Sequence, residues 1–94
     1  MVEPFDPEKD ARNRLERGVP LSLGFDVIAG ALVEFEDTRH DYGERRLVCF
    51  GEVSGRLYAC VYTVQESGPR IISVRKANSR EQKRFGRRSD DAGR

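Results

Sequence analysis

Alternating apolar and polar positions between residues 31 and 76 give the strongest structural signal in the chain. Residues 57–64 read Leu-Tyr-Ala-Cys-Val-Tyr-Thr-Val, with apolar side chains at both odd and even positions. That pattern favours a strand covered on both faces, and therefore central in its sheet. A turn signal follows at Ser67-Gly68-Pro69, and residues 70–76 then predict a second strand. Its alternation sets Ile72 and Val74 on one face, and the opposite face carries Ile71, Ser73 and Arg75.

Two further strands precede this hairpin. Residues 31–36 place Val33 and Phe35 on one face, and residues 45–52 continue the alternation. Ser54-Gly55 predicts a tight turn into the strand at 57–64. Because all the connections are short, the four strands predict an antiparallel meander.

Two helices are predicted before these strands in the sequence, and one helix is predicted after them. The first begins near Asp6-Pro7, a capping residue followed by a proline suited to the first helical position, and ends at Gly18. The second spans about residues 20–29, with one apolar face formed by Leu21, Gly24, Phe25 and Ile28. A glycine on that face favours close packing against the sheet. The last covers about 80–85, with Ser79 as its cap, Gln82 completing a capping box and Phe85 as its one large anchor.

These elements predict an α+β fold of two N-terminal helices, a four-stranded antiparallel meander and a C-terminal helix. Residues 1–86 are expected to form a single domain, and residues 87–94 a disordered tail. No apolar run approaches the roughly 20 residues needed to span a membrane, and the N-terminus lacks the pattern of a secretory signal. A cytosolic protein is therefore expected.

Charge is unevenly distributed along the chain. Residues 1–68 hold 8 Lys/Arg against 13 Asp/Glu, whereas residues 69–94 hold 9 Lys/Arg against 3 Asp/Glu. A basic C-terminal part can bind a polyanion, although a solvated helix and tail would give the same composition. Cys49 and Cys60 are interpreted as small core residues. Together with the single histidine they match no usual metal-ligand spacing, so neither a metal nor another cofactor is predicted.

Four pieces of sequence together resemble a known family. They are Phe-Asp-Pro-x-Lys at 5–9, Asp-x-Arg-His at 37–40 with Gly-Glu-x-Arg at 43–46, Gly-Arg-Leu at 55–57, and Arg-Ile-Ile-Ser-x-Arg-x-Ala at 70–77. The chain is similar to BrnT-type toxins of bacterial type II toxin–antitoxin pairs over roughly residues 4–85. The resemblance implies a RelE-like fold, an endoribonuclease activity that arrests growth, and an antitoxin partner with a ribbon-helix-helix DNA-binding part. By the same resemblance, the toxin–antitoxin complex is expected to bind operator DNA.

Metal-independent RNA cleavage requires a base for the 2′-hydroxyl, an acid for the leaving oxygen and cations for the charged phosphorane. His40 lies in a polar loop and is a candidate for proton transfer, because an imidazole can titrate near neutral pH; Glu44 can orient it or act as the base. Arg46, Arg75 and Arg80 are the candidate phosphate-binding cations. The alternatives are an exposed His40 without a role and surface ion pairs for the carboxylate and the arginines.

A second set of residues is predicted to bind substrate. Ser73 shares the polar face with Arg75. Tyr62 can stack on a base or donate a proton, although a buried core tyrosine is the favoured interpretation. Lys76, Lys83 and Arg84 are expected to attract RNA without sequence preference. A non-catalytic module that binds RNA or a partner through the same basic face is the alternative function.

Overall fold

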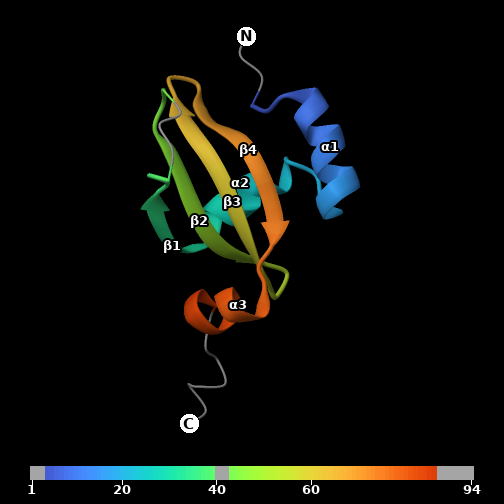
Figure 1. Cartoon of the computed structure of the whole chain (residues 1–94), viewed down its shortest axis with the longest axis vertical. Helices are drawn as coiled ribbons and strands as arrows, with labels where there is room; N and C mark the ends of the chain where they lie inside the picture. The colour runs from blue at the N-terminus through green and yellow to red at the C-terminus, as the bar shows by residue number, and fades with distance from the viewer. Residues whose placement is uncertain (1–3, 40–42, 87–94) are drawn as a thin grey trace.

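A computed structural model describes residues 4–39 and 43–86. The elements follow the order α1 (Pro7–Arg17), α2 (Leu23–Ala29), β1 (Ala31–Glu36), β2 (Arg46–Val53), β3 (Arg56–Gln65), β4 (Gly68–Lys76) and α3 (Ser79–Phe85). All neighbouring strands pair antiparallel, in the spatial order β1-β2-β3-β4. The predicted α+β arrangement is confirmed, as is the central position of β3. In Figure 1, α2 crosses one face of the sheet, α1 runs beside β4, and α3 lies beyond the strand ends.

The first helix begins and ends at the predicted residues and is bonded to the edge of the sheet. The Glu8 N–H donates to Asp6 Oδ1 (2.9 Å), and Gly18 closes the helix with a left-handed φ of 78°. Its one buried residue is Asn13, whose side-chain amide donates to the carbonyls of Val19 (2.8 Å) and Val74 (2.9 Å). A side chain on α1 therefore satisfies backbone groups on the outer edge of β4.

The second helix begins three residues later than predicted. Residues 20–22 instead form a tight turn, in which the N–H of Leu23 donates to the Pro20 carbonyl (3.2 Å). The Leu21 N–H is bound by Asp10 Oδ1 (2.7 Å), which ties this turn to α1. The predicted close packing at Gly24 is confirmed, because a Cβ there would lie 2.9 Å from the Ile71 side chain. The apolar pattern missed Val27, which is completely buried.

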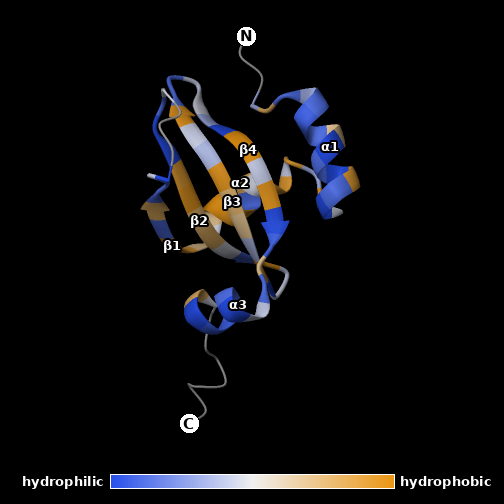
Figure 2. Ribbon diagram, in the orientation of Figure 1, coloured by the Kyte–Doolittle hydropathy of each residue, from blue (hydrophilic) through white to orange (hydrophobic). Residues whose placement is uncertain are grey.

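The main core lies between α2 and the sheet. It contains the following buried residues: Val19, Leu21, Val27, Leu47, Cys49, Cys60, Tyr62, Ile71 and Val74. A smaller cluster on the opposite face joins Phe50, Leu57, Ala59 and Ala77, with Phe85 of α3 packed against it. Figure 2 shows the apolar strands and α2 in contrast with the largely hydrophilic α1 and α3. Within residues 4–39 and 43–86, the sheet face away from α2 is covered where Phe85 of α3 packs against it.

A β-bulge in β4 corrects the predicted faces of that strand. Tyr62 pairs with Ile71 and Val61 pairs with Ser73, so Ile72 is an extra residue. Ile71 consequently joins Val74 in the main core, and the prediction that Ile71 lies on the opposite face, with Ser73 and Arg75, is wrong. The Ile71 N–H donates to the Pro4 carbonyl (2.8 Å), so the N-terminal segment meets the strand at the bulge. Ser73 and Arg75 keep their predicted place on the open face.

The cap of α3 also differs from the prediction. Asn78, not Ser79, is the capping residue, and Glu81, not Gln82, completes the capping box. The Glu81 N–H donates to Asn78 Oδ1 (2.8 Å), while the Asn78 N–H donates to Glu81 Oε1 (2.9 Å). A capping box is present as predicted, but it lies one residue earlier in the chain than predicted. None of the helices in the described part of the chain is long and apolar enough to cross a membrane.

Candidate functional site

A hollow of about 600 Å³ lies on the sheet face away from α2. Its floor consists of alternate residues of the central strands, Val48, Phe50, Ala59 and Val61. Its rim is more polar and consists of Arg17, residues 36–39, Ser73, Arg75 and Glu81. A volume of this size, with an apolar floor and a few charged groups, is typical of a ligand site.

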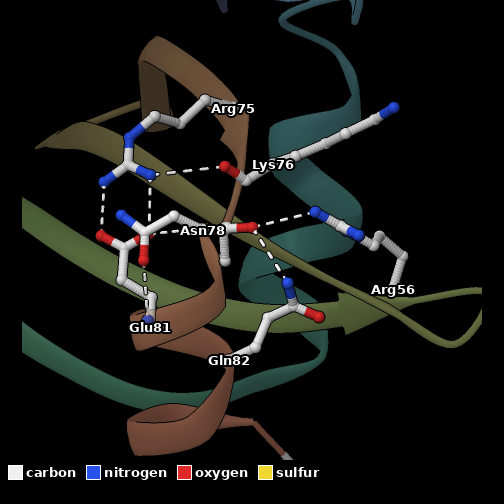
Figure 3. Close-up of polar contacts among 7 residues, drawn as sticks. Arg56, Arg75, Lys76, Asn78, Glu81 and Gln82 are labelled. Carbon is white, nitrogen blue, oxygen red and sulfur yellow. Dashed lines mark hydrogen bonds and ion pairs between the residues drawn. The ribbon is translucent and has the colours of Figure 1, made fainter.

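Arg75 is the best-defined cation of the rim. Its Nη1 and Nη2 donate to the two carboxylate oxygens of Glu81 at 2.8 and 2.7 Å, and Nη1 also reaches the Lys76 carbonyl at 3.4 Å (Figure 3). The pair joins β4 to α3. The hydrogen bonds to Arg75 lower the pKa of Glu81, and those to Glu81 raise the pKa of Arg75. Both groups are therefore charged at neutral pH.

A second guanidinium on the rim, Arg39, is also bound by a carboxylate. Its Nε and Nη2 each lie 2.9 Å from an oxygen of Asp37, whose side chain is buried. The Asp37 N–H donates to the Arg46 carbonyl (2.8 Å), which extends the β1–β2 ladder and fixes this loop. The positive charge of Arg39 opposes the rise in the pKa of Arg75 that Glu81 causes. The two guanidinium groups therefore lie close enough to interact electrostatically.

A third cation, Arg17, comes from the last turn of α1. Its guanidinium is exposed and makes no hydrogen bond or ion pair with any residue in 4–39 or 43–86. Arg17 and Arg39 were not singled out as site residues from the sequence. Arg39 belongs to the Asp-x-Arg-His motif. No local motif marks Arg17, because its place on the rim depends on how α1 packs against the sheet.

Two of the predicted catalytic residues lie elsewhere. Arg46 Nε and Glu44 Oε2 are 3.3 Å apart and line a separate small hollow near Thr63 and Arg70. The structure thus groups Ser73 with Arg75 but does not place Glu44 or Arg46 in the same hollow. His40 lies outside the described residues.

Tyr62 is positioned on the opposite side of the sheet from Arg75. It is only 6% exposed, packs in the main core, and its hydroxyl donates to Glu34 Oε2. Burial, followed by the bond to Glu34, raises the pKa of this hydroxyl. The core interpretation of Tyr62 fits these contacts, and its ring does not reach the hollow.

The remaining predicted residues do not line the hollow. Arg80, Lys83 and Arg84 are exposed on α3, and the Arg84 guanidinium lies 5.3 Å from the centre of the Phe85 ring. Lys76 is exposed at the end of β4 and extends away from Arg75 (Figure 3). These side chains can contribute positive potential near the hollow, as expected for nonspecific attraction.

The two cysteines face each other across β2 and β3. Both are free and completely buried, which confirms that they are core residues. A hydrogen bond between the thiols lowers the pKa of Cys49 and raises that of Cys60. Within residues 4–39 and 43–86, no group of three or more potential metal-binding side chains comes together.

The hollow therefore combines guanidinium groups, a serine hydroxyl and an apolar floor, which suits a phosphate-bearing ligand with flat apolar parts. Comparison with protein families finds that the model of the family described as "Ribonuclease toxin, BrnT, of type II toxin-antitoxin system" matches residues 5–81. A comparison with curated proteins finds no similar sequence.

Proposed function

Because the chain belongs to the BrnT family of ribonuclease toxins from type II toxin–antitoxin systems, we propose that it cleaves RNA in the hollow beside Arg75. The observation that carries this proposal is the position of Arg75 on the open sheet face, in one hollow with Arg17 and Arg39. Guanidinium groups bind phosphate oxygens in a bidentate manner and stabilise the charge that develops on a phosphorane. The reaction then needs no metal ion for charge stabilisation.

Each residue has a definite role in this proposal. Arg75 binds the scissile phosphate after exchanging its bond with Glu81 for bonds to the phosphate oxygens, and Ser73 donates a hydrogen bond beside it. Arg17 and Arg39 hold the adjoining phosphates. His40 stays the candidate for proton transfer, because an imidazole titrates near neutral pH. Glu44 and Arg46 would act on a neighbouring part of the RNA, given their separate position.

Type II systems pair a toxin with a protein antitoxin, so a protein partner and an RNA substrate both follow from the family. We propose further that the antitoxin carries a ribbon-helix-helix DNA-binding part, that it covers the basic open face, and that the complex binds operator DNA. Expression of this chain alone should then arrest bacterial growth, and co-expression of the small neighbouring open reading frame should restore it.

The test uses purified protein without partner, incubated with total RNA in the presence of EDTA. The wild type should cleave RNA, and Arg75→Ala should lose roughly 100- to 1,000-fold in rate, the usual cost of removing one group that stabilises transition-state charge. Arg14→Ala is the matched control, because Arg14 is also paired with a carboxylate (Asp10, 3.0 Å) but lies on α1 outside the hollow. Cleavage lost equally in both variants would contradict the assignment.

The alternative function is a binding module without turnover. It is favoured by the fact that both Arg75 and Arg39 are held by carboxylates in the unbound chain. Tight binding of RNA that stays intact, with wild-type protein and with or without added Mg²⁺, would support that alternative and reject the nuclease.

A further inference from the structure

Among the described residues, Phe35 is the one aromatic side chain of the hollow that remains substantially exposed. It is 45% exposed, whereas Phe50, its neighbour on β2, is only 3% exposed. The Phe35 ring centre lies 6.3 Å from those of Phe50 and Phe85, which themselves stack at 4.5 Å. The ring is thus held by two aromatic partners while much of its surface faces solvent.

Its neighbours combine apolar and cationic chemistry. Phe35 pairs with Val48 across the β1–β2 ladder, and Val48 and Val61 continue the apolar floor. Beyond the ring, the rim carries Arg39 and Arg75. A flat apolar group that rests on Phe35 would therefore have guanidinium groups close by for an attached phosphate.

We propose that Phe35 is a stacking platform for one unpaired nucleobase of the bound RNA. This inference rests on the proposed function, because it assigns the base-binding part of the same hollow. Aromatic side chains stack on the faces of splayed, single-stranded bases, and this stacking tolerates any base since every base has a π-face. The platform selects single-stranded RNA, because a base in a duplex has no free face to offer.

An apolar side chain from a protein partner is the competing occupant of the ring. The cationic rim favours RNA, because the guanidinium groups beside the ring can bind the phosphate attached to a stacked base, whereas a purely apolar side chain offers them no such group. The two occupants are distinguished by whether a change at Phe35 affects RNA binding or partner binding.

The experiment is a double-mutant cycle between the ring and the base. Affinities are measured by fluorescence anisotropy for labelled single-stranded 2′-O-methyl RNA, which cannot be cleaved, with one abasic site moved along the oligomer. For the wild type and for Phe35→Tyr, one abasic position should weaken binding roughly 5- to 150-fold, the range measured for base–aromatic stacking. For Phe35→Leu, the same abasic site should change affinity by less than about two-fold, the scatter of independent effects.

Leu15→Ala is the control for loss of exposed apolar surface, because Leu15 is 86% exposed and lies on α1 outside the hollow. It should behave as the wild type at every abasic position, and thermal melting of all variants verifies that they are folded. The inference is overturned if Phe35→Leu shows the same abasic penalty as the wild type. It is also overturned if Phe35→Leu binds RNA normally but loses the antitoxin.

Failure of the proposed function gives a different result. A wild-type protein that neither binds nor cleaves single-stranded RNA contradicts both proposals. RNA cleavage that depends on Arg75, together with abasic penalties that do not depend on Phe35, refutes only the stacking platform.

Discussion

The ion pair between Arg75 and Glu81 predicts opposite effects of one substitution on stability and on RNA binding. The two carboxylate oxygens of Glu81 lie 2.7 and 2.8 Å from the guanidinium, in the place where phosphate oxygens would bind. Glu81→Gln removes the charge but keeps a side chain able to complete the capping box of α3. The carboxylate should therefore stabilise the free protein and compete with RNA.

The contribution of the Arg75–Glu81 pair to stability follows from the exposure of its two side chains. The side chains are 36% and 18% exposed, so solvent screening limits the pair to about 1 kcal/mol of stability. Loss of that amount should lower the melting temperature by about 4–8 °C in a domain of this size. The same 1 kcal/mol no longer opposes RNA binding, so the affinity of Glu81→Gln should rise about five-fold.

Melting temperature and RNA affinity are measured for the wild type, Glu81→Gln and Glu66→Gln. Glu66 is exposed in the turn between β3 and β4 and does not line the hollow, so its substitution controls for the change in net charge. The reasoning is refuted if Glu81→Gln binds RNA less tightly than Glu66→Gln, or if both gain affinity equally.

The same pair predicts how the effect depends on pH. The pKa of Glu81 is lowered in the folded protein, chiefly by its hydrogen bonds to Arg75. The stabilisation is therefore fully present above the unfolded-state pKa of about 4.3 and is lost as pH falls through the lower folded-state value. The difference in melting temperature between the wild type and Glu81→Gln should be constant above about pH 5 and shrink in more acidic buffer.

Three further substitutions test the positions of other residues. Tyr62→Phe should leave RNA cleavage unchanged and cost about 1 kcal/mol in urea unfolding, because it removes only the bond to Glu34 on the core face; a large loss of cleavage would move the site to that face. Asn13→Ala should lower the free energy of unfolding in urea by about 2–4 kcal/mol, because the Val19 and Val74 carbonyls lose their donor. A near-neutral result would mean that this residue does not hold α1 to β4. Gly51→Ala should abolish soluble folded protein on expression and gel filtration, because its Cβ would lie 2.2 Å from the Val27 carbonyl oxygen; a stable, soluble variant would contradict the close approach of α2 to β2.

Much of the fold could be predicted because its signals are local. Asp6, Pro7 and Gly18 fix the ends of α1 by backbone chemistry within one turn. The alternation in residues 31–76 specifies the strands, and their short connections specify the meander. The open face of β4 followed from the same alternation, which placed Ser73 and Arg75 together.

The features that were missed depend on contacts between distant segments. The bulge at Ile72 coincides with the approach of Pro4 to Ile71, which no local pattern encodes. The capping box is formed by Asn78 and Glu81, and the same Glu81 carboxylate accepts hydrogen bonds from Arg75. Phe35 was correctly placed on the face of Val33, but its exposure depends on how far α3 extends over the sheet.

The central claim is that RNA binds the open face of the sheet, in the hollow beside Arg75. The most direct measurement is a methyl NMR titration of valine-labelled protein with uncleavable 2′-O-methyl RNA. The account predicts large shifts for Val48 and Val61, which line the hollow, and small shifts for Val27 and Val74, which are buried in the main core between α2 and the sheet. Shifts confined to Val27 and Val74, or to the exposed Val64 outside the hollow, would contradict it.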